Sequence, residues 1–178
     1  GYVIAPAVPH LPAHPPPVNE PVAGNYFVAV YPPFSAWDSE QVPALHEALE
    51  QPDSGKPLGI YVHLPFCQKK CDYCYYLSYI AQPAAVVDQY LERVVRELAL
   101  YTERPGVKGR PLSFIYFGGG TPSSLSSTQV RYLMDGLRRG LAWGGIEEVT
   151  FECAPRSVRQ EFVETLRDIG VTRLSMGV

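Results

Sequence analysis

The chain has 178 residues, enough for one domain with a hydrophobic core, and its content of 46% hydrophobic and 19% charged residues is ordinary for a globular protein. A formal net charge of −3 offers no basic footprint for nucleic acid. No apolar run approaches the roughly 20 residues of a membrane span, so we expect neither a nucleic acid partner nor a membrane span.

Two segments without strong periodicity come first in the chain. Residues 1–24 contain seven prolines, which predicts a disordered or extended Pro-rich leader. Residues 25–56 carry five aromatic side chains, so we expect this segment to pack, with a short helix near 39–49 capped by Ser39. Together the two segments form an irregular N-terminal extension.

From residue 57 onwards, strand-like runs alternate with amphipathic helices. Capping boxes begin with Ser126 and Ser157, and Gly170 is placed to end a helix. Alternation of this kind predicts βα units and a parallel sheet. The expected strands are 58–65, 112–117, 146–153 and 171–177, and the expected helices are 83–102, 127–141 and 158–169.

The sequence ends directly after the fourth expected strand. A parallel strand needs covering helices, and no residues remain to supply them. We therefore expect a truncated α/β domain, a partial (βα) barrel of TIM type with about three and a half βα units. The gene is expected to continue past Val178 with a helix and further strands.

The strongest chemical signal is the spacing Cys67-x3-Cys71-x2-Cys74, directly after the first strand. A [4Fe–4S] cluster usually takes four thiolates, so three on one loop leave one iron open to a substrate or cofactor. The alternative is a zinc site, which needs four protein ligands and usually pairs C-x2-C units. Cys153 lies far along the chain and His63 in mid-strand, so the spacing favours a cluster over zinc.

The same cysteines also indicate the cellular compartment in which the protein works. Their close spacing is not that of a disulfide framework and indicates a reducing environment. The N-terminal residues lack the basic and then apolar pattern of a signal peptide. We therefore expect a cytoplasmic protein.

A glycine triplet follows the second expected strand, in the run GGGTP at residues 118–122. Glycines let the backbone approach a ligand closely, although a lone triplet is more often a flexible turn. In a βα barrel, ligands bind at the C-terminal ends of the strands. The cysteine loop, GGGTP and Glu152 fall on three successive ends, which favours a ligand site there.

These motifs resemble those of the radical S-adenosylmethionine (SAM) superfamily. The runs YVHLPFCQKKCDYCYY, FGGGTPSSLS, FECAPRSV and IGVTRLSMGV are similar to the oxygen-independent coproporphyrinogen III oxidases and their relatives. The resemblance covers about residues 25–178. It implies a pre-barrel segment at 25–56 and the N-terminal part of a radical SAM barrel at 57–178.

The resemblance also implies roles for individual residues. Three irons of the [4Fe–4S] cluster are held by Cys67, Cys71 and Cys74, and the amino and carboxylate groups of SAM chelate the fourth. The implied SAM contacts are Tyr61, Tyr73, Gly119, Gly120, Thr121 and Glu152. In the coproporphyrinogen enzymes the stretch that matches Gly119, Gly120 and Thr121 also binds a second SAM molecule. The alternatives are an ordinary strand aromatic for Tyr61 and a solvated charge for Glu152.

A few neighbouring residues carry weaker expectations. We expect Cys153 to be a small core residue. Arg156 either pairs with Glu152 or with SAM, or lies on the surface. Four residues either line the pocket or simply pack, namely His63, Tyr75, Tyr76 and Tyr79.

The implied chemistry is a one-electron reaction in which the reduced cluster cleaves SAM and a 5′-deoxyadenosyl radical abstracts a hydrogen from the substrate. We expect an oxidoreductase that acts on a tetrapyrrole, with flavodoxin or ferredoxin as reductant. One position departs from the family, because coproporphyrinogen oxidases carry a further cysteine where this chain has Tyr76. Two alternatives therefore stay open: a radical SAM C-methyltransferase or cyclopropanase, and a non-catalytic haem chaperone.

Overall fold

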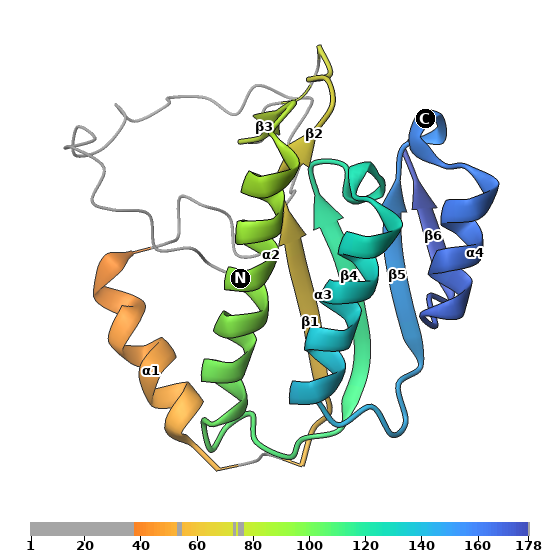
Figure 1. Cartoon of the computed structure of the whole chain (residues 1–178). Helices are drawn as coiled ribbons and strands as arrows, with labels where there is room; N and C mark the ends of the chain where they lie inside the picture. The colour runs from red at the N-terminus through yellow and green to blue at the C-terminus, as the bar shows by residue number, and fades with distance from the viewer. Residues whose placement is uncertain (1–37, 53–54, 73, 75–76, 178) are drawn as a thin grey trace, which may run out of the picture. The chain divides into compact units, whose positions relative to one another are not determined.

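A computed structural model describes residues 38–52, 55–72, 74 and 77–177 (Figure 1). The expected leader at 1–24 lies outside the described residues, as do residues 25–37 and 53–54 of the segment at 25–56. The chain separates into two units between His46 and Glu47, and the sheet with its helices belongs to the unit that begins at Glu47. No described helix is long and apolar enough to cross a membrane.

Two short elements precede the sheet. They are the 3-10 turn η2 (Ser39–Gln41) and the helix α1 (Val42–Glu50), so the expected helix in this region is confirmed. Its expected cap is wrong, because the Asp38 carboxylate rather than Ser39 accepts a hydrogen bond from the first turn, from the Glu40 N–H at 3.0 Å.

In the described part of the chain, four parallel strands form the main sheet (Figure 1). They are β1 (Leu58–Leu64), β4 (Leu112–Gly119), β5 (Glu148–Cys153) and β6 (Arg173–Met176), in the spatial order β1-β4-β5-β6. Parallel neighbours place all four C-terminal ends at one edge of the sheet. The predicted α/β class and parallel sheet are confirmed.

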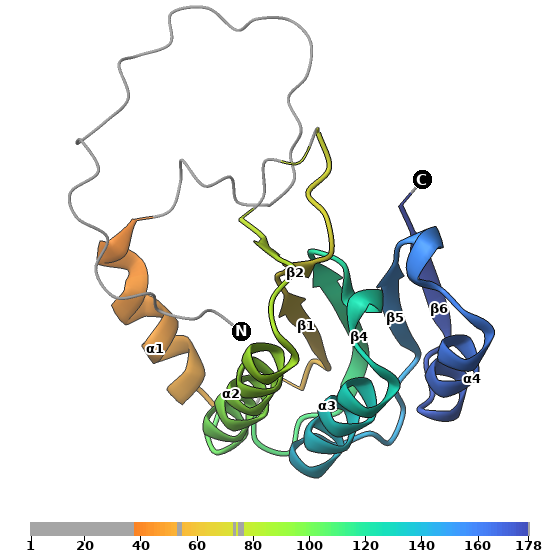
Figure 2. The same cartoon turned by 45° about the horizontal axis from the view of Figure 1, so that its top comes forward.

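Three helices, α2 (Ala84–Thr102), α3 (Ser127–Gly140) and α4 (Gln160–Asp168), cover one face of this sheet (Figure 2). Alternate strand residues point toward them because successive side chains of a strand face opposite sides. The core on this face includes Leu64, Ile115, Phe117, Val149 and Phe151. Each of β1, β4 and β5 is followed by one helix, and β6 begins a fourth unit.

The two expected capping boxes have different outcomes. The Ser126 box is confirmed, since the Gln129 N–H donates to Ser126 Oγ at 3.2 Å and the Ser126 N–H donates to Gln129 Oε1 at 2.9 Å. The Ser157 box is wrong: α4 begins two residues later than a Ser157 cap requires, with Arg159 as its N-cap. The Ser157 hydroxyl instead bonds Ser123 Oγ and the carbonyl of Ala154.

Candidate functional site

The cysteine loop leaves the C-terminal end of β1 and is closed by a small second sheet. Its strands β2 (Phe66–Cys67) and β3 (Tyr79–Ile80) pair in parallel. Backbone hydrogen bonds from Tyr79 to the Pro65 carbonyl at 2.8 Å and from Ala81 to the Cys67 carbonyl at 2.9 Å fasten both ends. The loop that carries the three cysteines is therefore anchored beside the main sheet.

All three loop cysteines are free thiols, with Cys71 exposed and Cys67 and Cys74 half-buried. The backbone turns between two of them, where the Cys74 N–H donates to the Cys71 carbonyl at 3.0 Å. Among the described residues, no three His, Cys, Asp or Glu side chains are arranged as a ready metal site. Tyr73, the expected aromatic SAM contact in this loop, lies outside the described residues.

The GGGTP run meets the start of the cysteine loop at the end of β4. Gly120 N–H donates to the Leu64 carbonyl at 2.8 Å, and Thr121 N–H donates to the Phe66 carbonyl at 2.7 Å. The Thr121 hydroxyl lies 3.4 Å from Cys67 Sγ. A Cβ on Gly120 would stand 2.6 Å from the Phe66 carbonyl oxygen and 2.9 Å from Cys67 Sγ. Only glycine allows this approach of backbone to sulfur.

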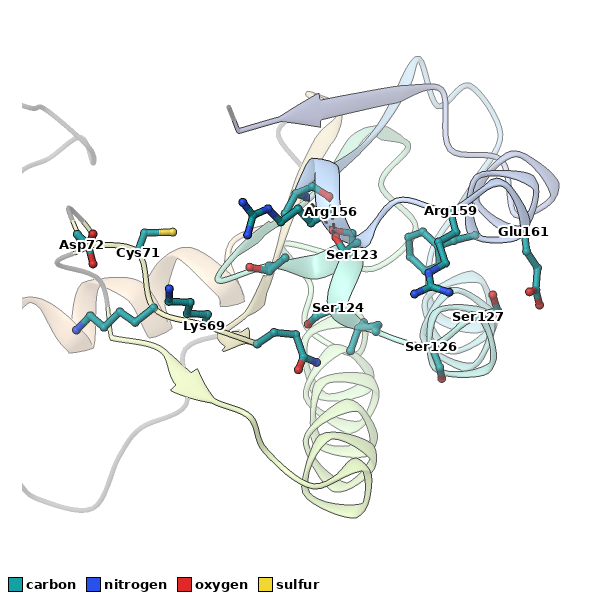
Figure 3. Close-up of a pocket in the computed structure, with 17 residues that line it drawn as sticks. Lys69, Cys71, Asp72, Ser123, Ser124, Ser126, Ser127, Arg156, Arg159 and Glu161 are labelled. Atoms are coloured by element: carbon teal, nitrogen blue, oxygen red, sulfur yellow. Dashed lines mark hydrogen bonds between the residues drawn. The ribbon is translucent and has the colours of Figure 1, made fainter.

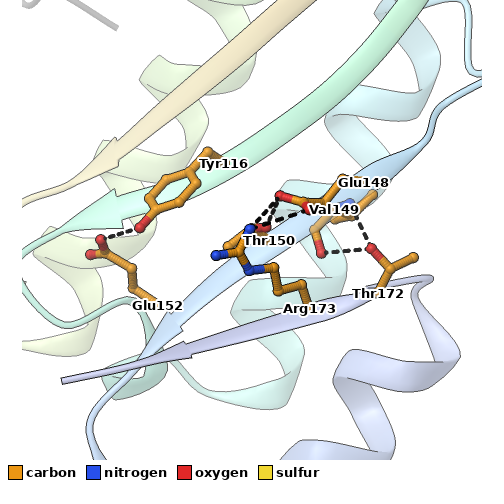
Figure 4. Close-up of polar contacts among 7 residues, drawn as sticks. All are labelled: Tyr116, Glu148, Val149, Thr150, Glu152, Thr172 and Arg173. Carbon is orange, nitrogen blue, oxygen red and sulfur yellow. Dashed lines mark hydrogen bonds and ion pairs between the residues drawn. The ribbon is translucent and has the colours of Figure 1, made fainter. Parts of the chain in front are cut away.

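Glu152 is fixed at the C-terminal end of β5 by two donors, of which Figure 4 shows Tyr116. Tyr116 Oη donates to Glu152 Oε1 at 2.6 Å, and the Gly119 N–H donates to Oε2 at 3.2 Å. Burial and the hydrogen bond to Glu152 raise the pKa of Tyr116, so its phenol stays a donor at neutral pH. Sequence reasoning missed Tyr116, whose only signal was its position two residues before the glycine triplet.

Tyr61 stands on β1 beside this pair. Its ring stacks on that of Tyr116, with centroids 6.0 Å apart and 25° between the planes. Its hydroxyl lies 3.1 Å from Nδ1 of His63, and burial lowers the pKa of His63, which keeps that imidazole neutral at pH 7. Tyr61, Tyr116 and Glu152 thus line the sheet face that the helices leave open.

A second polar group lies lower on β5 and β6 (Figure 4). Glu148 accepts from the Thr150 hydroxyl at 2.6 Å and pairs with Arg173 at 3.3 Å, and these contacts lower the pKa of Glu148. The Val149 N–H donates to the Thr172 hydroxyl at 2.9 Å. The bonds to Arg173 and Thr172 join β5 to the segment that contains β6, so their role is to hold the sheet edge.

A pocket of about 830 Å³ opens on the helix side of the cysteine loop (Figure 3). Cys71 and Thr121 line it, together with the serine-rich turns η3 (Pro122–Ser124) and η4 (Pro155–Ser157). Arg156 lines this pocket as well, and no bond to Glu152 is among the contacts of the described residues. Cys153 is 4% exposed, as expected for a core residue.

The sequence matches the family model of the radical SAM superfamily over residues 61–178. The chain belongs to the radical SAM superfamily. Members generally hold a [4Fe–4S] cluster and use it to cleave SAM. The match covers β1 from Tyr61 onwards, the cysteine loop, GGGTP and Glu152, which are the parts whose geometry is described above.

Several radical SAM relatives are similar to this chain. It is 36% identical over 123 residues to the oxygen-independent coproporphyrinogen III oxidase of Escherichia coli, covering 69% of this chain and 26% of that protein. It is 34% identical over 122 residues to the heme chaperone HemW of Escherichia coli, covering 68% of this chain and 32% of that protein.

A solved structure supports the same assignment to the radical SAM superfamily. The coproporphyrinogen III oxidase HemN of Escherichia coli, described as a radical SAM enzyme, superposes with a TM-score of 0.69 at 34% identity. The match covers 76% of this chain and 31% of HemN, so the fold is a partial radical SAM barrel of TIM type. The chain spans about a quarter to a third of the length of these relatives.

The residues present fit the cluster that the superfamily implies. Three free thiols stand on one loop, and Gly120 leaves the space beside Cys67 Sγ that a side chain would fill. The Thr121 hydroxyl at that sulfur is a ready donor to a thiolate. Because metal binding organises ligands that are otherwise apart, the exposed Cys71 is free to close onto iron.

Proposed function

We propose that this chain is the cluster- and SAM-binding part of an oxygen-independent coproporphyrinogen III oxidase-like enzyme that acts on a tetrapyrrole. In this proposal Cys67, Cys71 and Cys74 are the iron ligands. When bound, the cluster supplies the electron that cleaves SAM. The protein residues bind and orient SAM and keep water from the reacting atoms.

The contact between the cysteine loop and GGGTP carries the proposal. Gly120 and Thr121 bond to carbonyls of residues 64 and 66 while Thr121 also reaches Cys67 Sγ. A ligand on the open iron would therefore meet glycine backbone directly. We propose that the carbonyls and N–H groups of Gly119, Gly120 and Thr121 bind the amino group and carboxylate of the first SAM molecule.

Glu152 and Tyr61 complete the proposed SAM site. The two donors to Glu152 leave its remaining lone pairs free to accept from a cationic ligand, and they hold the carboxylate in one orientation. Tyr61 is 50% exposed on the same sheet face, so its ring offers an apolar wall for SAM. Tyr73 is proposed as a second aromatic wall.

The relatives favour a tetrapyrrole as the ligand class, because both the oxidase and HemW are named for porphyrin or heme chemistry. A haem chaperone is a second candidate, favoured by the 34% identity to HemW. Tyr76, where the oxidases carry a cysteine, is a difference from them within the cysteine loop. We propose a flavodoxin or ferredoxin as the reductant.

The deciding experiment uses the full-length protein, reconstituted anaerobically with iron and sulfide. Incubation with SAM, reductant and coproporphyrinogen should give 5′-deoxyadenosine together with decarboxylated tetrapyrrole, identified by mass spectrometry. The Cys71→Ala variant is the matched control and should give neither product. If the protein binds haem but forms no 5′-deoxyadenosine, the haem chaperone is the correct function and the oxidase is not.

A further inference from the structure

The pocket beside the cysteine loop is basic although the chain as a whole is acidic. Its lining includes four cationic side chains against two carboxylates, whereas the formal net charge of the chain is −3. Lys69 and Lys70 come from the cysteine loop, and Arg156 and Arg159 from η4 and the start of α4. The two pairs therefore come from two different segments that line one opening.

These four cations have no ion-pair partner among the described residues, and all four are exposed. Five other cations of the described chain each pair with a carboxylate within 4.0 Å, namely Arg104, Lys108, Arg131, Arg167 and Arg173. Unpaired cations gathered at one opening leave a positive potential there that an acidic surface can meet.

The pocket also reaches a proposed iron ligand. Cys71 is exposed and lines the pocket, and Figure 3 shows its side chain and that of Arg156 pointing toward one another. None of Tyr61, Gly119 and Glu152 lines it. Thr121, a proposed SAM contact, does line the pocket, so the pocket adjoins the proposed SAM site at GGGTP while the sheet face with Tyr61 and Glu152 lies outside it.

We infer that this basic opening is the docking surface for an acidic one-electron carrier protein of the flavodoxin kind. The inference rests on the proposed function, which requires one electron for each SAM cleaved. The docked carrier is oxidised by one electron and the cluster is reduced by one. Redox encounters of this kind bury little area and depend on complementary charge, which the four unpaired cations provide.

Two double charge reversals test the docking surface, one for the pair of lysines and one for the pair of arginines. Lys69→Glu with Lys70→Glu alters the cysteine loop, and Arg156→Glu with Arg159→Glu leaves that loop unchanged. Lys56→Glu with Arg139→Glu is the control with the same change in charge, since Lys56 precedes β1 and Arg139 lies in the last turn of α3, at the opposite end of the sheet.

The first readout is the binding of a purified acidic flavodoxin to the reconstituted full-length protein, which is measured by calorimetry at low and at high salt. Both pocket variants should raise the dissociation constant on the order of tenfold or more and flatten its salt dependence. The control variant should bind as the wild type does. An unchanged dissociation constant in both pocket variants, or an equal loss in the control, would overturn the docking surface.

The second readout separates docking from chemistry. With reduced flavodoxin below saturation, 5′-deoxyadenosine formation should fall in the pocket variants by the same factor as binding. With photoreduced deazariboflavin, a small reductant that needs no docking surface, it should equal the wild-type rate. If the wild type forms no 5′-deoxyadenosine with either reductant, the proposed function fails, while the calorimetry still decides the docking surface.

Discussion

The Tyr116 hydroxyl donates to Glu152 at 2.6 Å from the neighbouring strand, and the Tyr116 ring also stacks on Tyr61. One side chain thus links two residues that we propose as SAM contacts. Glu152 receives its second hydrogen bond from the Gly119 backbone, which is part of GGGTP. Tyr116 is accordingly a positioning residue for the Glu152 carboxylate, and its loss should weaken the binding of SAM.

Tyr116→Phe keeps the stacked ring and removes the hydroxyl. Because the Glu152 carboxylate loses one of two fixed donors, SAM affinity should fall by about 1 kcal/mol, roughly fivefold. Glu152→Ala removes the carboxylate and should cost about 1.5–3 kcal/mol. Tyr132→Phe, at an exposed tyrosine on α3, is the control. Equilibrium binding of SAM measures all three, and equal affinity in Tyr116→Phe and wild type would show that Tyr116 positions nothing.

Gly120→Ala should disrupt the contact between GGGTP and the cysteine loop. The added Cβ would stand 2.6 Å from the Phe66 carbonyl oxygen, a distance that real Cβ contacts do not reach, and this oxygen belongs to the backbone and not to a flexible side chain. We expect less iron per chain after reconstitution and weaker SAM binding. Gly144→Ala is the matched control, because nothing lies within 4 Å of its added Cβ. Full iron loading in Gly120→Ala would refute the close approach.

The four thiols should differ in reactivity before iron is added. Burial raises the pKa of Cys153 to about 11, so its thiolate is scarce at neutral pH. Iodoacetamide should therefore modify Cys67, Cys71 and Cys74 and leave Cys153 intact until the protein unfolds. Peptide mapping by mass spectrometry identifies the cysteines that iodoacetamide has modified. Iron reconstitution should then protect the three loop thiols, and protection of Cys153 instead would mean that the ligand set is wrong.

Tyr90 should make stability fall at alkaline pH. Its hydroxyl donates to the His63 carbonyl at 2.8 Å, and burial raises its pKa from 10.0 to about 12. The unfolded chain releases this proton first, so the free energy of unfolding declines as pH rises through that interval. Tyr90→Phe should unfold about 1 kcal/mol more easily near neutral pH and show a shallower alkaline decline. Urea unfolding across the range measures both, and an unchanged alkaline slope would count against this assignment.

Much of the fold was readable from the sequence because the helices and longer strands repeat their apolar residues regularly. The Ser126 box marked the start of α3 correctly, since its hydroxyl accepts from the Gln129 N–H as the motif requires. At Ser157 the same motif failed, because Ser123 and the Ala154 carbonyl take the hydroxyl that a cap would need. A local motif cannot reveal a partner that only the folded sheet brings near.

In the candidate site, too, local sequence patterns were predictable and contacts that depend on the folded sheet were not. The cysteine spacing and the glycine run were visible as local patterns, and their meeting at one sheet edge followed from parallel strands. The β2–β3 pair was missed because each strand has two residues, too few for a periodic signal. The Tyr116–Glu152 bond was missed because it depends on the register of β4 against β5, which pairs Phe117 with Phe151.

The most direct test of the account is SAM cleavage by the full-length protein after anaerobic reconstitution. The wild type should bind about four irons per chain. With reductant it should release 5′-deoxyadenosine from SAM, and Cys67→Ala, Cys71→Ala and Cys74→Ala should each abolish both properties while Cys153→Ala keeps them. Zinc in place of iron, or 5′-deoxyadenosine formation that survives in Cys71→Ala, would contradict the assignment of this loop as the cluster site.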